Sequence, residues 1–276
     1  MLDRKQSHSI FASLERQLDK LAKKPASKNI HKFRTYGRRV ETILSELGPD
    51  GRPLQKKLLK QLKRLRKKAG RVRDLDVQVA TLRSLKIPQE PAHKVQLFRV
   101  LAEERDKDEK KIVDAFDKNT VRSLRRRLKH ASREVDTGGA KDPLIMALAE
   151  LAQLGRDHLA LTEKTLHQYR VAGKRARYLA EVAGKSSAAD QMIKQLKHMQ
   201  DVIGDWHDWL KLTERAEELF GSSQESALVA ALRNITRAKF RQAAEALTEM
   251  RAQLAEGKAG RKGPTRQLAK AEAAVA

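Results

Sequence analysis

The chain contains one short motif twice, and this repetition limits its fold more than any other feature. The motif is a histidine, an arginine three residues later and two basic residues seven and eight residues later: His31, Arg34, Arg38 and Arg39, and again His167, Arg170, Lys174 and Arg175. A second landmark follows each copy, with Gly70 and Asp74 in the first case and Gly204 and Asp208 in the second. The spacing is 136 residues between the histidines and 134 between the glycines. We therefore expect two versions of one folding unit.

The residue types favour helices. Leu, Ala, Lys, Arg, Glu and Gln dominate the 276 residues, which include seven prolines and no cysteine. A chain of this length buries a substantial core, and the lack of cysteine excludes disulfides and thiolate metal sites. No apolar run is as long as the roughly 18 residues of a membrane span, and residues 1–9 are not followed by the apolar segment of a signal peptide. We expect a cytoplasmic protein without membrane contact, metal or cofactor.

Helical periodicity extends along almost the whole sequence. Helices are predicted near residues 8–24, 28–47, 52–69, 73–85 and 91–134, and again near 143–164, 166–183, 187–203, 206–220 and 224–256. The break between the two series contains Gly-Gly and Asp-Pro, which are loop-forming pairs. The predicted fold is all-α, with antiparallel helices joined by short loops. It comprises a first half over 1–135, a linker over 136–143, a second half over 144–256 and a basic, disordered tail over 257–276.

The charge is strongly positive and unevenly distributed. The net charge is +24, with a pI near 10.3, so the protein attracts anions of many kinds. Residues 1–138 hold 37 Lys and Arg against 18 Asp and Glu, whereas residues 139–276 hold 22 against 17. The stretch from Lys28 to Arg73 has 16 basic and three acidic residues. A single run of charge usually marks only a solvated helix face. Whether these charges bind a ligand therefore depends on where they lie on the helices.

The two motif helices separate apolar from cationic residues. At about 100° per residue, the apolar faces comprise Phe33, Tyr36, Val40, Ile43, Leu44 and Leu47 in the first helix, and Tyr169, Ala172, Ala176, Leu179, Ala180 and Ala183 in the second. The opposite faces carry His31, Arg34 and Arg38, and His167, Arg170, Lys174 and Arg177. These cationic stripes contain no acidic residue, although an ordinary solvated face mixes Glu with Lys because opposite charges stabilise a helix. The pattern favours an anionic ligand.

Further basic residues accompany the two glycines. Lys63 and Lys197 lie seven residues before them, and Arg73 and His207 lie three residues after them. Each glycine is expected to end one helix, and the next helix should begin within a few residues. Asp74 and Asp208 would then cap that next helix or orient a nearby arginine. For Arg73 and His207, contact with the ligand and pairing with a neighbouring side chain both stay open. Trp206 and Trp209, on either side of His207, are expected to pack inside the bundle.

These phrases resemble a known family. The second half reads His167-Gln-Tyr-Arg-Val-Ala-Gly-Lys-Arg-Ala-Arg-Tyr and then Leu196-Lys-His-Met-Gln-Asp-Val-Ile-Gly-Asp-Trp-His-Asp. The first half reads His31-Lys-Phe-Arg-Thr-Tyr-Gly-Arg-Arg and then Leu65-Arg-Lys-Lys-Ala-Gly-Arg-Val-Arg-Asp-Leu-Asp-Val. Four phrases in order, in two matched halves, are similar to the CHAD domain, the conserved histidine α-helical domain. The resemblance covers nearly the whole chain except the tail.

The resemblance implies two four-helix bundles related by a pseudo-two-fold axis, with a basic channel or groove between them. It also implies binding of inorganic polyphosphate and an association with polyphosphate granules. The implied binding residues are His31, Arg34, Arg38, Arg39, Lys63, Arg66 and Arg73 in the first half, and His167, Arg170, Lys174, Arg177, Lys197 and His207 in the second. One departure is that the first half has Arg66 and Lys67 where the second has Gln200 and Asp201. No triphosphate-metabolising domain, such as some relatives carry, precedes residue 8, so that activity is not transferred.

Four functions could use a strongly basic helical chain of this kind. A non-catalytic polyphosphate-binding protein needs Arg and Lys donors on rigid helices and no aromatic platform. A non-specific nucleic-acid-binding protein fits the charge, but aromatic residues make up only 4%, so base stacking is poorly supplied. A phosphate-processing enzyme with His31 or His167 as nucleophile would need a metal-holding acidic group or a phosphate loop, and Asp74 and Asp76 do not face each other on a helix. A plain interaction scaffold would not explain acid-free stripes. The sequence favours the first function and predicts no catalysis.

Overall fold

The structure is a computed structural model that describes residues 2–48, 52–86, 90–135, 141–156, 160–222 and 224–260, without the side chains of residues 153–156 and 254–260. Within these ranges every named element is a helix, and the strand-type pairing is limited to one isolated bridge between Leu2 and Ala183. The all-α prediction is confirmed for this part of the chain. None of the helices in it is both long and apolar enough to cross a membrane.

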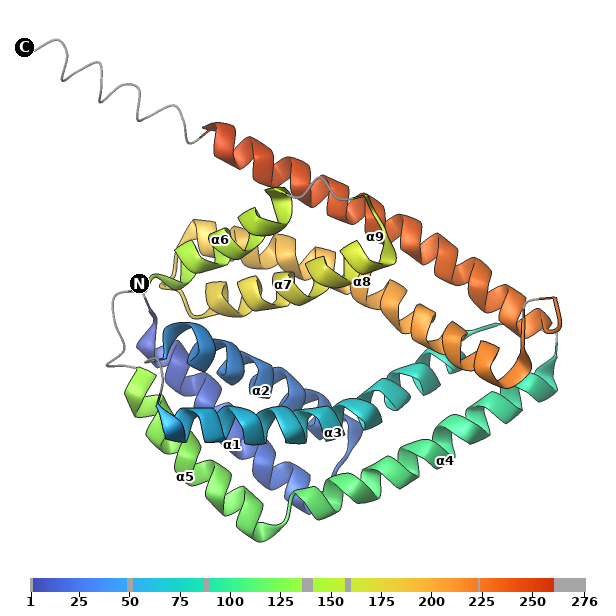
Figure 1. Ribbon diagram of the computed structural model, residues 1–276, viewed down its shortest axis with the longest axis horizontal. Coiled ribbons are helices and arrows are strands. Elements are labelled where there is room, and N and C mark those ends of the chain that lie inside the picture. The colour runs from blue at the N-terminus through green and yellow to red at the C-terminus, as the bar shows by residue number, and fades with distance from the viewer. Residues whose placement is uncertain are drawn as a thin grey trace, which may run out of the picture.

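The helices fall into two consecutive series (Figure 1). The first half contains α1 (Arg4–Lys23), α2 (Ser27–Leu47), α3 (Pro53–Ser84), α4 (Pro91–Ala115) and α5 (Lys118–Val135). The second half contains α6 (Pro143–Arg156), α7 (Glu163–Glu181), α8 (Ser187–Phe220) and α9 (Ala227–Gly260). The repeated motifs therefore lie on α2 and α7, and the two glycine landmarks lie on α3 and α8.

Several helix ends follow directly from local sequence chemistry. Asp3, Thr162 and Ser186 cap α1, α7 and α8, because each side-chain oxygen accepts a hydrogen bond from a backbone N–H of the first turn. At the other end of α8, Gly221 has a positive φ of 75°, which L side chains rarely adopt. The capped start of α7 corrects the sequence-based limits near this point: the predicted helices 143–164 and 166–183 are observed as Pro143–Arg156 and Glu163–Glu181.

The prediction that Gly70 and Gly204 end helices is wrong. Both lie inside single continuous helices, α3 and α8, of 32 and 34 residues. A glycine inside a helix costs only about 1 kcal/mol relative to alanine, and the apolar residues on both sides of each glycine keep the same helical face buried. The predicted pairs 52–69 with 73–85, and 187–203 with 206–220, are therefore each one helix. Asp74 and Asp208 do not cap a helix, because they lie in helix interiors.

The predicted helix 91–134 is also wrong, since it is interrupted after Ala115. Phe116 leaves the helical conformation with φ −102° and ψ 38°, and its side chain is buried in the core. Asp117 then starts α5 by accepting hydrogen bonds from the backbone N–H groups of Asn119 (2.8 Å) and Thr120 (2.9 Å). Phe116 packs against Phe33, with ring centroids 5.0 Å apart. This packing and the capping by Asp117 outweigh the continuous apolar periodicity, which favoured a single helix.

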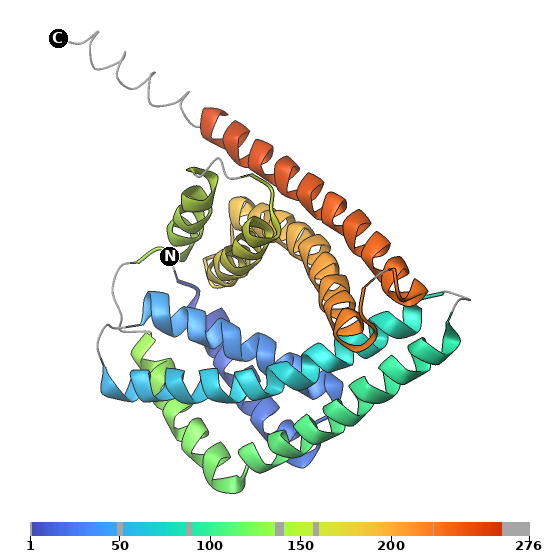
Figure 2. The ribbon, with the colours of Figure 1, turned by 45° about the vertical axis from the view of Figure 1, so that its right-hand side comes forward.

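Two buried clusters hold the helices together. The larger core draws side chains from both halves, including Phe33 and Leu65 from the first and Tyr169, Leu196 and Trp206 from the second. The smaller core lies where the hairpins α3–α4 and α8–α9 meet at one end of the molecule, as Figures 1 and 2 show. The predicted linker, 136–143, falls between α5 and α6, with residues 136–140 outside the described part. Helix α9 extends to Gly260, and residues 261–276, which hold most of the predicted tail, lie outside the described residues.

Candidate functional site

The two faces predicted for the motif helices are observed. On α2, Phe33, Val40 and Ile43 are fully buried. All six residues of the second predicted apolar face are also buried, five of them on α7 and Ala183 just after its end. Helices α2 and α7 pack against each other, and each also packs on the helix that follows it, α3 or α8. The predicted cationic faces are therefore half-buried between helices or open to solvent. The core does not require their charges, because apolar residues fill it.

Arg34 lies directly on the backbone of α3. A Cβ atom at Gly70 would lie 2.1 Å from Nη1 of Arg34, so only glycine leaves room for the guanidinium in this position. Nη2 of Arg34 lies 3.5 Å from a carboxylate oxygen of Asp74, one turn further along α3. The expectation that Asp74 orients a nearby arginine is thus met by Arg34. Gly204 differs from Gly70, because no heavy atom lies within 4 Å of the corresponding Cβ position.

Three of the predicted binding residues already have acidic partners. Arg39 reaches across to Glu181 on α7 with Nε 2.7 Å from a carboxylate oxygen, and Nε of Arg177 lies 3.8 Å from the same carboxylate. Arg66 on α3 binds Glu41 on α2 at 2.7 Å. The Arg39 guanidinium also lies over the ring of Tyr178, 5.8 Å from its centroid. Arg39 and Arg66 thus join helices, whereas Arg177 pairs within α7 itself, four residues before Glu181.

Arg38, Arg170 and Lys174 lack such partners. None of the three has an ion pair or hydrogen bond to the described side chains, although all three are half-buried. Nε of Arg170 is fully buried and has no hydrogen-bond acceptor. Burial lowers the pKa of Arg38, and the charges of Arg66 and Arg170 lower it further. Burial is likewise the main cause of the lowered pKa of Arg170, with Asp208 and Asp74 acting in the opposite direction.

Lys174 has the most perturbed amine of this site. Burial lowers its pKa from 10.5 to about 7, helped by the positive charges of Arg170, Arg38 and Arg34, whereas Asp208 raises it. The charges that act on Lys174 come from both halves of the chain, since Arg34 and Arg38 lie on α2 and Arg170 lies on α7. The two cationic stripes therefore form one cluster.

The histidines of the two motifs are exposed and lie at the edge of this cluster. Burial of part of the ring lowers the pKa of His31, followed by the charges of Arg73, Arg34 and Lys174. The pKa of His167 is lowered by partial burial and then by His207, whose ring centroid is 6.2 Å away. Nδ1 of His207 is buried without a hydrogen bond and lies 3.8 Å from Asp208. Arg73 and His207 thus both lie beside the motif histidine of their own half.

The remaining candidates and one missed residue complete the site. Lys63 and Lys197 are exposed, and nothing in their contacts links them to the other cationic residues. Lys211 was missed by the sequence analysis: its charge lowers the pKa of His167, and it pairs with Glu214 at 2.5 Å. Its position four residues after His207, one helical turn along α8, was the signal that could have found it. We call the following set the central cluster: His31, Arg34, Arg38, Arg73, His167, Arg170, Lys174 and His207.

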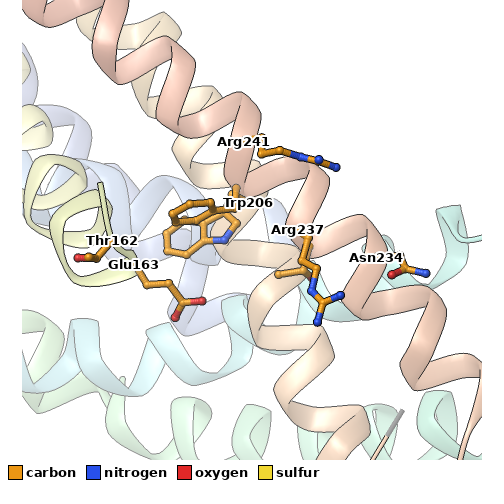
Figure 3. Close-up of a pocket in the computed structure, with 8 residues that line it drawn as sticks. Thr162, Glu163, Trp206, Asn234, Arg237 and Arg241 are labelled. Atoms are coloured by element: carbon orange, nitrogen blue, oxygen red, sulfur yellow. The ribbon is translucent and has the colours of Figure 1, made fainter. Parts of the chain in front are cut away.

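A pocket of about 850 Å³ lies on the other side of the second half, between α9, α8 and the start of α7 (Figure 3). Its lining comprises Thr162, Glu163, Trp206, Asn234, Thr236, Arg237, Phe240 and Arg241. Trp206 is buried in the bundle as predicted, and Trp209 is half-buried. None of the predicted binding residues lines this pocket, so it is distinct from the central cluster.

Comparison with solved structures supports the fold. The crystal structure of the CHAD domain from the plant Ricinus communis superposes with a TM-score of 0.69 at 16% identity, covering 91% of this chain and 90% of that one. PptA from Streptomyces chartreusis gives a TM-score of 0.61 at 12% identity, covering 93% of this chain and 100% of that one. No curated protein sequence gives a significant match. The sequence model of the CHAD domain matches residues 8–217, which is most of the chain and includes both motifs. The chain therefore belongs to the CHAD domain family.

Proposed function

We propose that this protein binds inorganic polyphosphate, without catalysing its turnover, through the central cluster. The observation that carries the proposal is the combination of half-burial and missing acidic partners at Arg38, Arg170 and Lys174. Burying a charge without a counter-charge is unfavourable. The lowered pKa values of these groups express the same cost, because each reports that the charged form is disfavoured.

An anion removes this cost when it binds. Phosphoryl oxygens accept charge-assisted hydrogen bonds from guanidinium groups, often two at a time from one arginine. The guanidinium of Arg34, fixed over Gly70, offers such a geometry on rigid helices. The bound anion adds negative charge beside Arg38, Arg170 and Lys174, for which Asp74, Asp208 and Glu41 only partly compensate without forming an ion pair.

A long, base-free polyanion fits the arrangement better than a small one. The cluster extends over α2 and α7, with Arg73 from α3 and His207 from α8, so its charges come from two halves of the chain. The association of the CHAD family with polyphosphate supports the same ligand. In this proposal the two halves form pseudo-symmetric four-helix bundles around a basic channel or groove, and the bound chain anchors the protein to polyphosphate granules.

Non-specific binding of nucleic acid is a second candidate, and one feature favours it. The exposed side of α3 carries a set of basic residues that have no ion pair among the described side chains: Lys56, Lys60, Lys63, Lys67 and Arg71. Such a stripe suits the phosphates of a nucleic acid backbone, which bind without reading bases. Polyphosphate binding should therefore be weakened most by substitutions in the central cluster, and nucleic acid binding by substitutions in the α3 stripe.

A competition titration tests the proposal. Long-chain polyphosphate is titrated against duplex and single-stranded nucleic acid at equal phosphate concentration and physiological salt. We expect polyphosphate to win, to lose at least tenfold in affinity in Arg38→Gln/Lys174→Gln, and to change less than threefold in the matched surface variant Lys60→Gln/Lys67→Gln. Equal affinity for nucleic acid, or greater sensitivity to the surface variant, contradicts the proposal.

Absence of turnover is a separate part of the proposal. The purified protein should release no phosphate from polyphosphate or from nucleoside triphosphates when Mg²⁺ or Mn²⁺ is added. Phosphate release that disappears in His31→Gln or His167→Gln would instead identify an enzyme.

A further inference from the structure

Lys174 combines three properties that seldom occur together in a lysine. It lies within a cluster of cationic groups, with Arg170 one turn before it on α7 and Arg34 and Arg38 on α2. It has no ion pair and no hydrogen bond to the described side chains. Its amine nitrogen is not among the fully buried atoms that lack a partner, so it keeps contact with solvent. An amine in this setting is half-buried but not sealed from solvent, unpaired, and surrounded by groups that attract phosphate.

We propose that Lys174 is a site of covalent acylation by acyl phosphates, the mixed anhydrides of a carboxylic acid and phosphoric acid. The phosphate group of such a molecule binds the guanidinium groups around Lys174, which brings the adjacent carbonyl carbon to the amine. The inference rests on the proposed function in one respect, since the same cationic groups attract both ligands.

The reaction needs no further reagent. The neutral amine of Lys174 attacks the carbonyl carbon of the acyl phosphate, and a new C–N bond forms. The bond between the carbonyl carbon and the bridging oxygen breaks, and inorganic phosphate leaves with its electron pair. The proton lost by the amine passes to the departing phosphate or to water. The product is an amide on Lys174, and the arginines stabilise the negative charge of the leaving group.

The protonation state of Lys174 supports this chemistry. Only a neutral amine is nucleophilic, and with a pKa of about 7 roughly half of Lys174 is neutral at pH 7. An ordinary lysine with a pKa near 10.4 is neutral to less than about 0.1% at this pH. The groups that set this state come from every packed element: Arg34 and Arg38 on α2, Arg170 on α7, and Asp208 on α8, with His31 and Arg73 next to Arg34.

Acylation would regulate the polyanion site. The amide is neutral, so the modification removes one positive charge from the central cluster permanently. Bound polyphosphate would in turn shield Lys174 and favour its protonated form. The site would therefore be modified when it is empty and protected when it is occupied.

The test uses acetyl phosphate and the full chain. The protein is incubated with acetyl phosphate at pH 7.2, and acetylation of each lysine is followed by peptide mass spectrometry. We expect Lys174 to react at least tenfold faster than Lys164, which lies on the same helix and is exposed. Long-chain polyphosphate should suppress the reaction of Lys174 at least fivefold and that of Lys164 far less.

Two further arms separate the causes. Acetic anhydride, which carries no phosphate, reports nucleophilicity alone, and acetyl coenzyme A reports whether another acyl donor is used. Lys174→Arg should abolish the fast reaction, and Lys164→Arg should leave it unchanged. Labelling of Lys174 no faster than that of Lys164 by acetyl phosphate overturns the inference. Polyphosphate affinity of the untreated protein is measured separately, so a failure of the proposed function would be seen independently.

Discussion

At the scale of single residues, neighbouring basic side chains on α2 have different roles. Arg38 and Arg39 are adjacent in sequence and both belong to the motif. Arg39 reaches Glu181 at 2.7 Å and joins α2 to α7, whereas Arg38 has no acidic partner and has a lowered pKa because of burial. Substitutions of Arg38 and Arg39 should therefore differ in their effect on stability, although the two residues are neighbours in the sequence.

Arg39→Gln should destabilise the protein by about 1–3 kcal/mol, because it removes a charge-assisted contact and leaves Glu181 with one more distant arginine. Arg38→Gln should leave stability unchanged or raise it, since it removes like-charge repulsion, and should weaken polyphosphate binding about tenfold. Denaturant unfolding and a binding titration on both variants check this. A larger loss of stability in Arg38→Gln would reverse the assigned roles.

The pH dependence of binding should report Lys174. Its pKa of about 7 in the folded chain lies below the unfolded value, so folding disfavours the charged form, and its contribution to stability rises as the pH increases from about 7 towards 10.5. A bound polyanion restores the charge and should cause proton uptake. Polyphosphate affinity should therefore fall as the pH rises above about 7, and it should rise further as the pH falls from about 6.5 towards the lowered pKa values of His31 and His167.

Calorimetry in buffers of different ionisation enthalpy measures the proton uptake directly. Lys174→Gln should remove most of it near pH 7.5, and His31→Gln with His167→Gln should flatten the affinity profile below pH 6.5. Full proton uptake in Lys174→Gln would show that another group titrates.

At the scale of elements, the glycines inside the two long helices have different surroundings. Both helices continue through them, which the sequence did not predict. Gly37 and the matching Gly173 face equivalent positions of the next helix, because a Cβ atom there would lie 3.8 Å from Arg66 and 3.6 Å from Gln200. At Gly173 it would also lie 2.5 Å from Cε of Met199, so the second position is more tightly packed. The halves differ at Gly70, which is covered by Arg34, and Gly204, which is not covered.

This difference predicts opposite outcomes for two matched substitutions. Gly204→Ala should raise stability by about 0.5–1 kcal/mol, because alanine favours a helix and the space beside it is open. Gly70→Ala should displace the guanidinium of Arg34 from its place beside Asp74, give little gain in stability and lower polyphosphate affinity several-fold. Thermal unfolding with binding titrations decides, and equal effects of the two changes would contradict the assignment.

At the scale of the whole molecule, the two halves are joined along α2 and α7. Arg39 pairs with Glu181, and Arg175 pairs with Glu46, so each helix supplies one arginine and one glutamate to the other. The backbone N–H of Asp3 also donates to the carbonyl of Val182 at 2.8 Å. These contacts fix the positions of the two motifs relative to each other, and a long anion can therefore meet both as one surface.

Chain length of the ligand tests this arrangement. Long polyphosphate should bind far more tightly per molecule than tripolyphosphate, because the second engagement becomes intramolecular. Arg34→Gln/Arg38→Gln and Arg170→Gln/Lys174→Gln should each weaken long-chain binding sharply, and combining them should add little. Circular dichroism serves as the control for folding. Two independent sites of equal affinity in a calorimetric titration, one lost with each pair, would contradict a shared surface.

The sequence by itself determined the helical class and the face of each motif helix. These features depend on periodicity and composition, which are local properties, and the buried faces of α2 and α7 match them. The sequence also predicted the break between the halves, but not the continuity of α3 and α8 or the interruption at Phe116 and Asp117. In those places tertiary packing outweighed the local preference of a single residue.

Only the tertiary structure decided which basic residues are available to a ligand. In the sequence, Arg38, Arg39, Arg66 and Arg177 are equivalent positive charges. In the fold, Glu181 lies beside Arg39, 142 positions away in the chain, and Glu41 lies beside Arg66 on another helix. Only the acid beside Arg177 could be read from the sequence, because Glu181 follows it by four residues on α7. Charge pairing acts through space over a few ångströms, and no spacing along one helix contains the positions of acids on another. The role of each cationic residue is therefore a property of how α2, α3 and α7 pack.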